Sequence, residues 1–231
     1  RMWANVTDND GFNKLVLSAG MSWRQAYLIR AYCRYLLQTG LPFSQLYMEQ
    51  VIDRNAGIAR LMVQLFEARF DPHMSSRKRK TIADQSLAEI NTALDKVASQ
   101  DEDRILRAFL TVIKATLRTN FYQLTDLGEF KAYVSFKLDP SKVPDLPLPR
   151  PKYEVFVYSP RMEGVHLRGG KVARGGLRWS DRMEDFRTEV LGLMKAQNVK
   201  NTLIVPVGAK GGFVCKHLPK GDRDTVMAEV I

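Results

Sequence analysis

A change of periodicity near residue 120, followed by a run rich in proline, constrains the fold of this chain more than any other feature. Apolar residues recur at helical spacing before it and alternate as in strands after it. Proline fixes φ and lacks a backbone N–H, so the run from Asp139 to Pro151 excludes both a helix and a central strand. Its five prolines are Pro140, Pro144, Pro147, Pro149 and Pro151.

Helices are expected throughout the first half of the chain. Ser22 to Gln25 forms a capping-box pattern that opens one helix, and Gly40 with Pro42 ends it. Ser44 is placed to cap the next helix. Apolar stripes at helical spacing predict three more, over 58–70, about 81–99 and about 102–118.

Strands and helices alternate in the second half. The stretch from Phe130 to Leu138 alternates and is rich in aromatic and β-branched residues, which is typical of a strand. Further strands are expected at 153–158, 165–167 and 202–205, and helices at about 185–199 and from residue 222. We therefore expect a mixed α/β fold in three parts: a helical region at 1–120, a connector with one strand at 121–151, and the start of an α/β domain at 152–231.

The formal net charge of +10 allows two interpretations. A basic protein can bind nucleic acid or an anionic surface, whereas the same charge can serve a small anionic ligand or be balanced elsewhere in a longer chain. The cluster Arg77-Lys78-Arg79-Lys80 follows a loop-like Met74-Ser75-Ser76. A solvated linker is the favoured interpretation of this cluster.

Other bulk features are those of a globular intracellular protein. No run approaches the roughly eighteen apolar residues that a membrane span needs, so a soluble, cytoplasmic protein is expected. Cys33 and Cys215 lie far apart in no metal-type or redox-type pair, which favours reduced thiols and no metal site. Arg1 is not a methionine and Ile231 falls within an expected helix, so both ends are expected to be internal to a longer chain.

The segment with the candidate ligand-binding residues begins with paired glycines between two arginines. Arg174 and Arg178 enclose Gly175, Gly176 and Leu177. Glycine allows a close backbone approach, and a guanidinium group binds carboxylate or phosphate through two parallel hydrogen bonds. This combination suits an anionic ligand.

An expected helix and a second glycine-rich segment follow. Gln197 and Lys200 are three residues apart, so an amide and an ammonium share one helix face, although a lone lysine there can also merely complement the helix dipole. The segment from Pro206 to Gly212 is expected to be a loop that presents Lys210 at the end of a strand, where open α/β sheets place ligand-binding groups. The sequence contains neither a P-loop nor a Gly-x-Gly-x-x-Gly fingerprint. Spacing alone thus predicts an anion-binding α/β module.

The run from Arg174 to Gly212 resembles the substrate-domain motif of glutamate dehydrogenases, and most closely that of the large NAD-specific class. The similar segments read Arg-Gly-Gly-Leu-Arg-Trp-Ser-Asp-Arg, Leu-Met-Lys-Ala-Gln-Asn-Val-Lys-Asn and Val-Pro-Val-Gly-Ala-Lys-Gly-Gly-Phe. The stretches 12–17, 65–72 and 157–168 are also similar to that class. The resemblance covers most of the chain, and the 174–212 motif is its most specific part.

The resemblance implies roles for particular residues. Arg174 occupies the place of a lysine that binds a substrate carboxylate, and Gln197 with Lys200 matches a Gln-x-x-Lys pair that grips a carboxylate. Lys210 matches the catalytic lysine of an Ala-Lys-Gly-Gly motif. The glycines of the two motifs belong to the same substrate site: Gly175, Gly176, Gly211 and Gly212. The chain departs from the common pattern in having arginine at 174 and one glycine fewer before Lys210.

The implied reaction is the NAD-dependent oxidative deamination of L-glutamate to 2-oxoglutarate and ammonia. Lys210 is expected to polarise the substrate carbonyl and activate water. NAD is expected to bind a domain outside these residues, so no residue here is assigned to the cofactor or to a metal. The full-length protein is expected to be a cytoplasmic homo-oligomer of nitrogen metabolism with no nucleic-acid or membrane partner. The isolated chain is expected not to turn over.

Two interpretations from other classes stay open at this point: a basic nucleic-acid-binding module, favoured only by the net charge, and a structural or regulatory fragment whose helices mediate assembly. A gel-shift assay at two salt concentrations tests the first. A nucleic-acid-binding module would bind below about a micromolar and weaken steeply with salt, because its phosphate contacts release counterions. We expect no such complex, and a salt-sensitive shift would favour the module.

Overall fold

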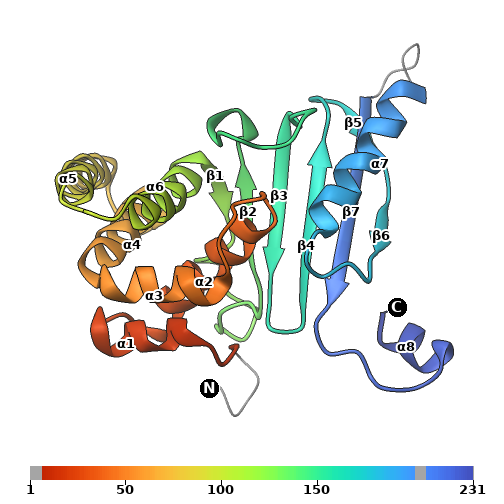
Figure 1. Cartoon of the computed structure of the whole chain (residues 1–231), viewed down its shortest axis with the longest axis horizontal. Coiled ribbons are helices and arrows are strands. Elements are labelled where there is room, and N and C mark those ends of the chain that lie inside the picture. Colours follow the sequence, from red (N-terminus) through yellow and green to blue (C-terminus); the bar gives the residue numbers. More distant parts are fainter. Residues whose placement is uncertain (1–6, 201–206, 231) are drawn as a thin grey trace.

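The computed structural model describes residues 7–200 and 207–230. Within these ranges, helices gather at one side of a seven-stranded mixed sheet and also cover part of its front face (Figure 1). The strand order is β1-β2-β3-β4-β7-β5, and β6 pairs with β7 as well. The predicted mixed α/β class, with helices first, is confirmed.

The helices of the first half begin at the serines that the sequence marks as caps. Their bounds are α1 Leu15–Ser18, after the 3-10 turn η1 Gly11–Lys14, then α2 Trp23–Leu37, α3 Gln45–Arg54, α4 Ala56–Phe70, α5 Ser76–Leu94 and α6 Gln100–Ala115. Ser22 forms a full capping box with Gln25, and Ser44 accepts a hydrogen bond from the Tyr47 N–H. None of the helices in the described ranges is long and apolar enough to cross a membrane.

Two expectations for this half were wrong. The basic cluster Arg77 to Lys80 is no linker, because Ser75 caps α5 and places the cluster in the first turns of that helix. The helix expected to reach residue 118 ends at Ala115, since Thr116 to Thr119 leave it as an edge strand that pairs with β2. Both errors concern helix ends that local capping and sheet pairing decide.

The sheet is antiparallel through five strands and parallel only at its far edge. Its strands are β1 Thr116–Thr119, β2 Val134–Leu138, β3 Tyr153–Tyr158, β4 Met162–Arg168, β5 Ala173–Arg174, β6 Leu177–Trp179 and β7 Val207–Cys215, with the 3-10 turn η2 Pro140–Lys142 after β2. Strands β5 and β6 both run parallel to β7. Two helices complete the chain, α7 Phe186–Lys200 and α8 Arg223–Val230.

Two expectations for the sheet were also wrong. The strand expected from Phe130 begins only at Val134, because the Phe130 ring instead lies 4.0 Å from the guanidinium carbon of Arg24. The expected loop at 206–212 is, from Val207 on, the first part of β7, which pairs with β4 from Ala209 to Cys215. The strand expected at 202–205 lies outside the described residues.

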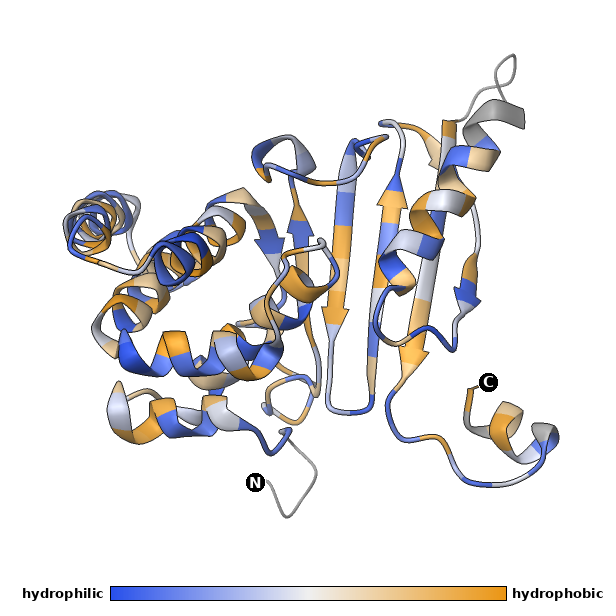
Figure 2. Cartoon of the chain, viewed as in Figure 1, coloured by the Kyte–Doolittle hydropathy of each residue, from blue (hydrophilic) through white to orange (hydrophobic). Residues whose placement is uncertain are grey.

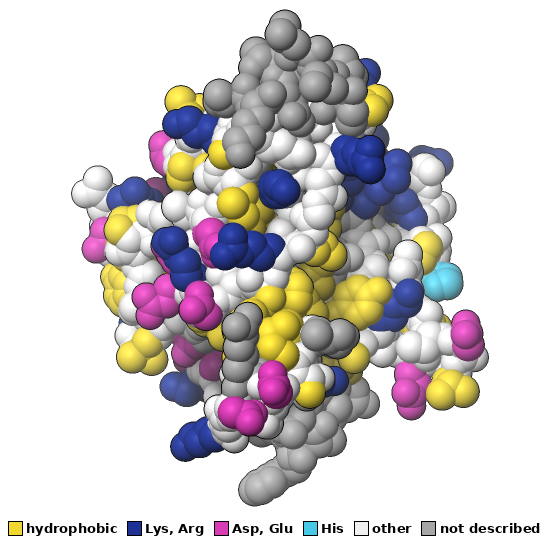
Figure 3. Space-filling view, turned by 90° about the vertical axis from the view of Figure 1, so that its right-hand side faces the viewer, with side chains coloured by type: hydrophobic (Ala, Val, Ile, Leu, Met, Phe, Trp, Pro, Cys, Tyr) yellow, Lys and Arg dark blue, Asp and Glu magenta, His cyan; other side chains and the backbone are white. Residues whose placement is uncertain are grey.

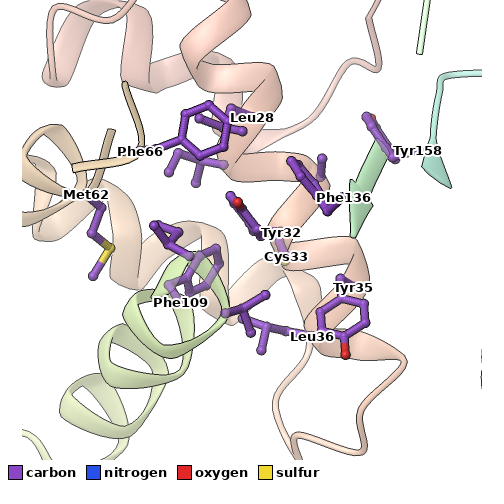
Figure 4. Close-up of a cluster of buried hydrophobic side chains, with 14 of the residues drawn as sticks. Leu28, Tyr32, Cys33, Tyr35, Leu36, Met62, Phe66, Phe109, Phe136 and Tyr158 are labelled. Atoms are coloured by element: carbon purple, nitrogen blue, oxygen red, sulfur yellow. The ribbon is translucent and has the colours of Figure 1, made fainter. Parts of the chain in front are cut away.

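One hydrophobic core joins the helices to the sheet, and α2 lies at its centre (Figure 4). Tyr32 stacks on Phe136 of β2 with ring centroids 4.3 Å apart, and Tyr35 meets Phe156 of β3 at 5.4 Å. Hydrophobic residues form orange bands along β3, β4 and β7 (Figure 2), and Phe156, Val165 and Val214 of these strands belong to the core. The core runs from η1 to β7, while the division at 120 and 151 stays a prediction.

A cluster of buried charges ties the first residues of the chain to the end of β7. Glu163 is fully buried and bonds Arg34 at 2.7 Å and Lys216 at 3.0 Å, and Lys216 also reaches Asp8 at 2.9 Å. Burial acts to raise the pKa of the Asp8 carboxyl, but Lys216 and a hydrogen bond from Tyr158 outweigh it and hold that pKa below its usual value. Each buried charge of this cluster thus lies beside at least one opposite charge, which offsets the cost of removing it from water.

A second buried ion pair anchors α7 to the sheet. Arg187 bonds both carboxylate oxygens of Glu154 at 2.7 Å, and both side chains are almost completely inaccessible to solvent. Burial alone would lower the pKa of the Arg187 guanidinium, yet the hydrogen bonds and charge of Glu154 raise it. Gln38 at the end of α2 adds hydrogen bonds to the carbonyls of Met183 and Glu184, just before α7. These contacts fix the N-terminal end of α7 relative to α2 and β3.

Breaking the Glu154–Arg187 ion pair should destabilise the fold. In Glu154→Gln, the Arg187 charge stays buried without its counterion, so we expect the free energy of unfolding to fall by about 3–5 kcal/mol in urea denaturation. Asp185→Asn breaks the exposed pair with Arg182 and should leave it almost unchanged. Equal effects of the two substitutions would show that the Arg187 charge is not desolvated as described.

Candidate active site

Lys210 lies in the middle of β7, on the face of the sheet that α7 covers. Its partner across the ladder is Leu167 of β4, which is fully buried on that face. Two residues further along β7, Gly212 also faces α7, because an ideal Cβ there would lie 2.4 Å from Val190. Strand alternation therefore places the half-buried Lys210 beside α7.

The glycines of β7 allow close packing on both faces. A side chain at Gly212 would collide with Val190 of α7, and one at Gly211 would lie 2.2 Å from Leu177 on the opposite face. His166 lies on that opposite face too, and burial and the charge of Arg168 lower its pKa. This histidine is therefore separated from Lys210 by the sheet.

Arg174 lies on the edge of the sheet, next to β7. It pairs in parallel with Gly208, and its side chain is exposed. At the following Gly175 the backbone passes so close to β7 that an ideal Cβ would lie 1.3 Å from the carbonyl oxygen of Ala209. Gly175 thus interrupts the edge strand between β5 and β6, and only glycine fits there.

Gln197 meets Arg174 through the backbone. Its Nε2 donates a 3.0 Å hydrogen bond to the Arg174 carbonyl, so the amide holds the edge strand against the C-terminal part of α7. Its Oε1 is buried without a hydrogen-bond partner among the residues that the structure describes. Lys200 lies in the last turn of α7, and its side chain is outside the described part of the chain.

The structure brings three of the predicted site residues to one corner of the molecule. Lys210, Arg174 and Gln197 come from three adjoining elements, β7, β5 and α7. In the described ranges, neither the Lys210 amine nor the Arg174 guanidinium forms an ion pair. Lys and Arg side chains gather above a hydrophobic patch on this side of the molecule (Figure 3). The corner can therefore accept an anionic ligand.

Sequence reasoning missed the polar contacts that hold the corner. Glu189 of α7 accepts a 2.5 Å hydrogen bond from Ser180, and its other carboxylate oxygen lies 3.7 Å from Arg178 Nε. These contacts join the edge strand and the turn after it to α7 over separations of nine and eleven residues in the chain. The only signal in the sequence is a carboxylate on the helix that follows the arginine.

Comparison with known proteins agrees with this geometry. Residues 89–231 match a family described as bacterial NAD-glutamate dehydrogenase, catalytic domain. Residues 7–72 match glutamate dehydrogenase, helical motif 3. The chain belongs to the bacterial NAD-glutamate dehydrogenase family. The catalytic-domain match includes every described strand of the sheet and both α7 and α8.

Three curated relatives of this chain carry the name NAD-specific glutamate dehydrogenase. Those of Halomonas elongata, Pseudomonas aeruginosa and Mycobacterium tuberculosis are 55%, 57% and 51% identical to it over 100%, 97% and 99% of its length. The chain spans 14% of the length of each relative. It therefore corresponds to a small part of those proteins.

The contact at Gly175 gives a stability test. Gly175→Ala should lower the free energy of unfolding by about 3 kcal/mol or more, because the new methyl group would overlap the Ala209 carbonyl and the strands would have to separate. Gly192→Ala, at an exposed site in α7 with no atom near the new methyl group, should raise it by about 0.5–1 kcal/mol. An unchanged denaturation midpoint for Gly175→Ala would contradict the described approach of the two strands.

Proposed function

We propose that the protein to which these residues belong catalyses the NAD-dependent oxidative deamination of L-glutamate to 2-oxoglutarate and ammonia. The observation that carries this proposal is the position of Lys210 on the α7 side of β7, beside an exposed arginine on the next strand. Family membership supports the same reaction. The substrate carries two carboxylates, which cationic side chains can hold.

Each site residue has a proposed part in this reaction. Lys210 polarises the carbonyl of 2-oxoglutarate and, in the other direction, activates the water that releases ammonia. Arg174 holds one carboxylate, and Gln197 with Lys200 grips a carboxylate from α7. The four glycines belong to the same proposed site: Gly176 leaves open space at the edge strand, while Gly175, Gly211 and Gly212 allow the close packing that positions β7 and its neighbours.

The buried position of β7 supports the role of Lys210. In a partly desolvated site a fixed ammonium stabilises negative charge on a reacting oxygen more strongly than it would in water. Lys210 is half-buried, and its strand is held on both sides by β4 and by β5 and β6. The amine thus belongs to a rigid element, which favours reproducible placement against a substrate.

Cofactor and assembly are proposed for the whole protein. NAD, which accepts the hydride from the α-carbon, would bind a domain outside these residues. The printed name of the relatives, NAD-specific glutamate dehydrogenase, supports this cofactor. We also propose that the whole protein is a cytoplasmic homo-oligomer with no nucleic-acid or membrane partner.

Substitution of Lys210 tests the proposed function in the intact enzyme. Lys210→Ala should lower kcat for glutamate oxidation by about 10²- to 10⁴-fold, the usual contribution of a positioned acid or base, in an assay of NADH formation. Lys195→Ala, at an exposed lysine of α7, is the matched control and should keep kcat within about twofold. Full activity of Lys210→Ala would refute the catalytic role.

The isolated 231-residue chain provides a second arm of this test. It should form no NADH from glutamate, while titration with 2-oxoglutarate should shift the backbone amide signals of Gly208 to Gly212 in NMR spectra. A fragment with a purely structural role would show no such shifts. NADH formation by the isolated chain that disappeared with Lys210→Ala would overturn the assignment of the cofactor to another domain.

A further inference from the structure

Three basic residues gather at the end of the sheet where β7 begins, close to Lys210 but outside the proposed site. Arg168, the last residue of β4, pairs with Ala209, which precedes Lys210 on β7. The Lys152 N–H donates a 2.6 Å hydrogen bond to the Arg168 carbonyl, and the Arg168 guanidinium donates one of 2.7 Å to the Lys171 carbonyl. Lys152, Arg168 and Lys171 therefore form one group, the cationic rim.

The positive charge at this end of the sheet exceeds the negative charge in the part of the chain that the structure describes. Residues 139–175 include seven Lys or Arg and four Asp or Glu. Two of the four acids, Glu154 and Glu163, are buried and already paired with cations from other segments. Asp139 pairs with Lys142 at 3.9 Å and also interacts with the charge of Lys152, so one carboxylate faces two lysines. The rim therefore keeps an excess of positive charge.

The rim lies close enough to the site to act through its electric field. Neighbouring strands are roughly 5 Å apart, so the backbone of Arg168 passes roughly 5 Å from β7 and that of Lys152 roughly 10 Å from it. The Debye length is about 8 Å at physiological ionic strength and about 30 Å at 0.01 M salt. Arg168 follows the buried Leu167 on β4, so it points to the face opposite Lys210. Its charge can thus reach a ligand beside Lys210 without a contact.

We propose that the cationic rim raises the local concentration of dianionic 2-oxoglutarate at the site and lowers that of ammonium. The inference rests on the proposed function, in which both molecules enter the reverse reaction. The interaction free energy of a ligand with a given potential is proportional to the charge of the ligand. A potential that attracts a dianion therefore repels a monocation with half the free energy. Since the rim makes no contact with the reacting atoms, it changes the two KM values and leaves the chemical step unaltered.

Steady-state kinetics of 2-oxoglutarate amination by the intact enzyme, at saturating NADH and about 0.01 M ionic strength, tests the rim. In the triple variant Lys152→Gln/Arg168→Gln/Lys171→Gln, the KM for 2-oxoglutarate should rise about fourfold or more and the KM for ammonium should fall about twofold, because the two ligands carry opposite charges. The kcat should stay within about twofold of the parent. At about 1 M salt, where the Debye length is about 3 Å, both KM values should return to those of the parent.

The basic cluster on α5 provides the matched control. Arg77→Gln/Lys78→Gln/Lys80→Gln removes the same net charge at three exposed side chains. Helix α5 lies at the opposite side of the molecule from β5 and β7 (Figure 1). This control should keep both KM values of the parent. Equal shifts in the two triple variants would show an effect of total charge alone, and the inference would fail.

Reversal of one exposed charge keeps the inference testable if the triple variant of the rim does not fold. The Lys171 side chain is exposed, and its amine forms no ion pair among the described residues. Lys171→Glu should therefore keep the thermal midpoint. At low salt it should raise the KM for 2-oxoglutarate about two- to threefold and lower the KM for ammonium, because it changes the local charge by two.

The outcomes separate this inference from the proposed function. If both KM values stay at those of the parent, or both rise, the rim does not act through its field, while loss of turnover in Lys210→Ala would still support the proposed function. A raised KM for 2-oxoglutarate that persists at about 1 M salt would indicate a direct contact and would also overturn the inference. An intact parent enzyme that is inactive with glutamate and 2-oxoglutarate would overturn both.

Discussion

Three tyrosines of helix α2 hold the molecule together, because each lies against the sheet. Tyr32 stacks on Phe136 of β2, Tyr35 meets Phe156 of β3 edge-on, and the ring centroid of Tyr27 lies 5.0 Å from that of Tyr158 at the end of β3. The other faces of α2 are buried as well, against α3, α4 and α6. A helix that is buried on almost every side determines where its neighbours lie. The remaining helices and the strands are therefore arranged around α2.

The candidate site takes its geometry from this packing. Helix α7 begins where Gln38 of α2 and Glu154 of β3 fix it, and its other end brings Gln197 to the carbonyl of Arg174. Between these two anchors α7 lies on β7, which carries Lys210. The groups proposed to hold substrate thus come from elements that the core positions, whereas flexible loops would have held them less precisely.

Features that depend on hydrogen bonds between neighbouring residues were easier to predict from the sequence than features that depend on long-range contacts. The caps at Ser22 and Ser44 were readable because their hydrogen bonds are made within three residues. The strand through Gly208 to Gly212 was mistaken for a loop, because what makes it a strand is close packing by Val190 and Leu177, far away in the sequence. For the proposed site, the motif predicted Lys210 and Arg174, which lie on the neighbouring strands β7 and β5. The contact between Gln197 and the Arg174 carbonyl and the pairing of Arg178 with Glu189 depend on register, which no short pattern encodes.

The buried charges around Glu163 have a consequence for dissecting the protein. Asp8 lies in the segment that matches the helical motif, whereas Glu163 and Lys216 lie in the segment that matches the catalytic domain. Separating the two segments would remove Arg34 from the buried carboxylate of Glu163 and Asp8 from Lys216. It would also expose the aromatic rings of the sheet that α2 covers. The boundary between the two matched segments is therefore not a boundary between units that unfold independently. A truncation at residues 73–88 would divide the chain within one hydrophobic core, and each piece would lack part of that core.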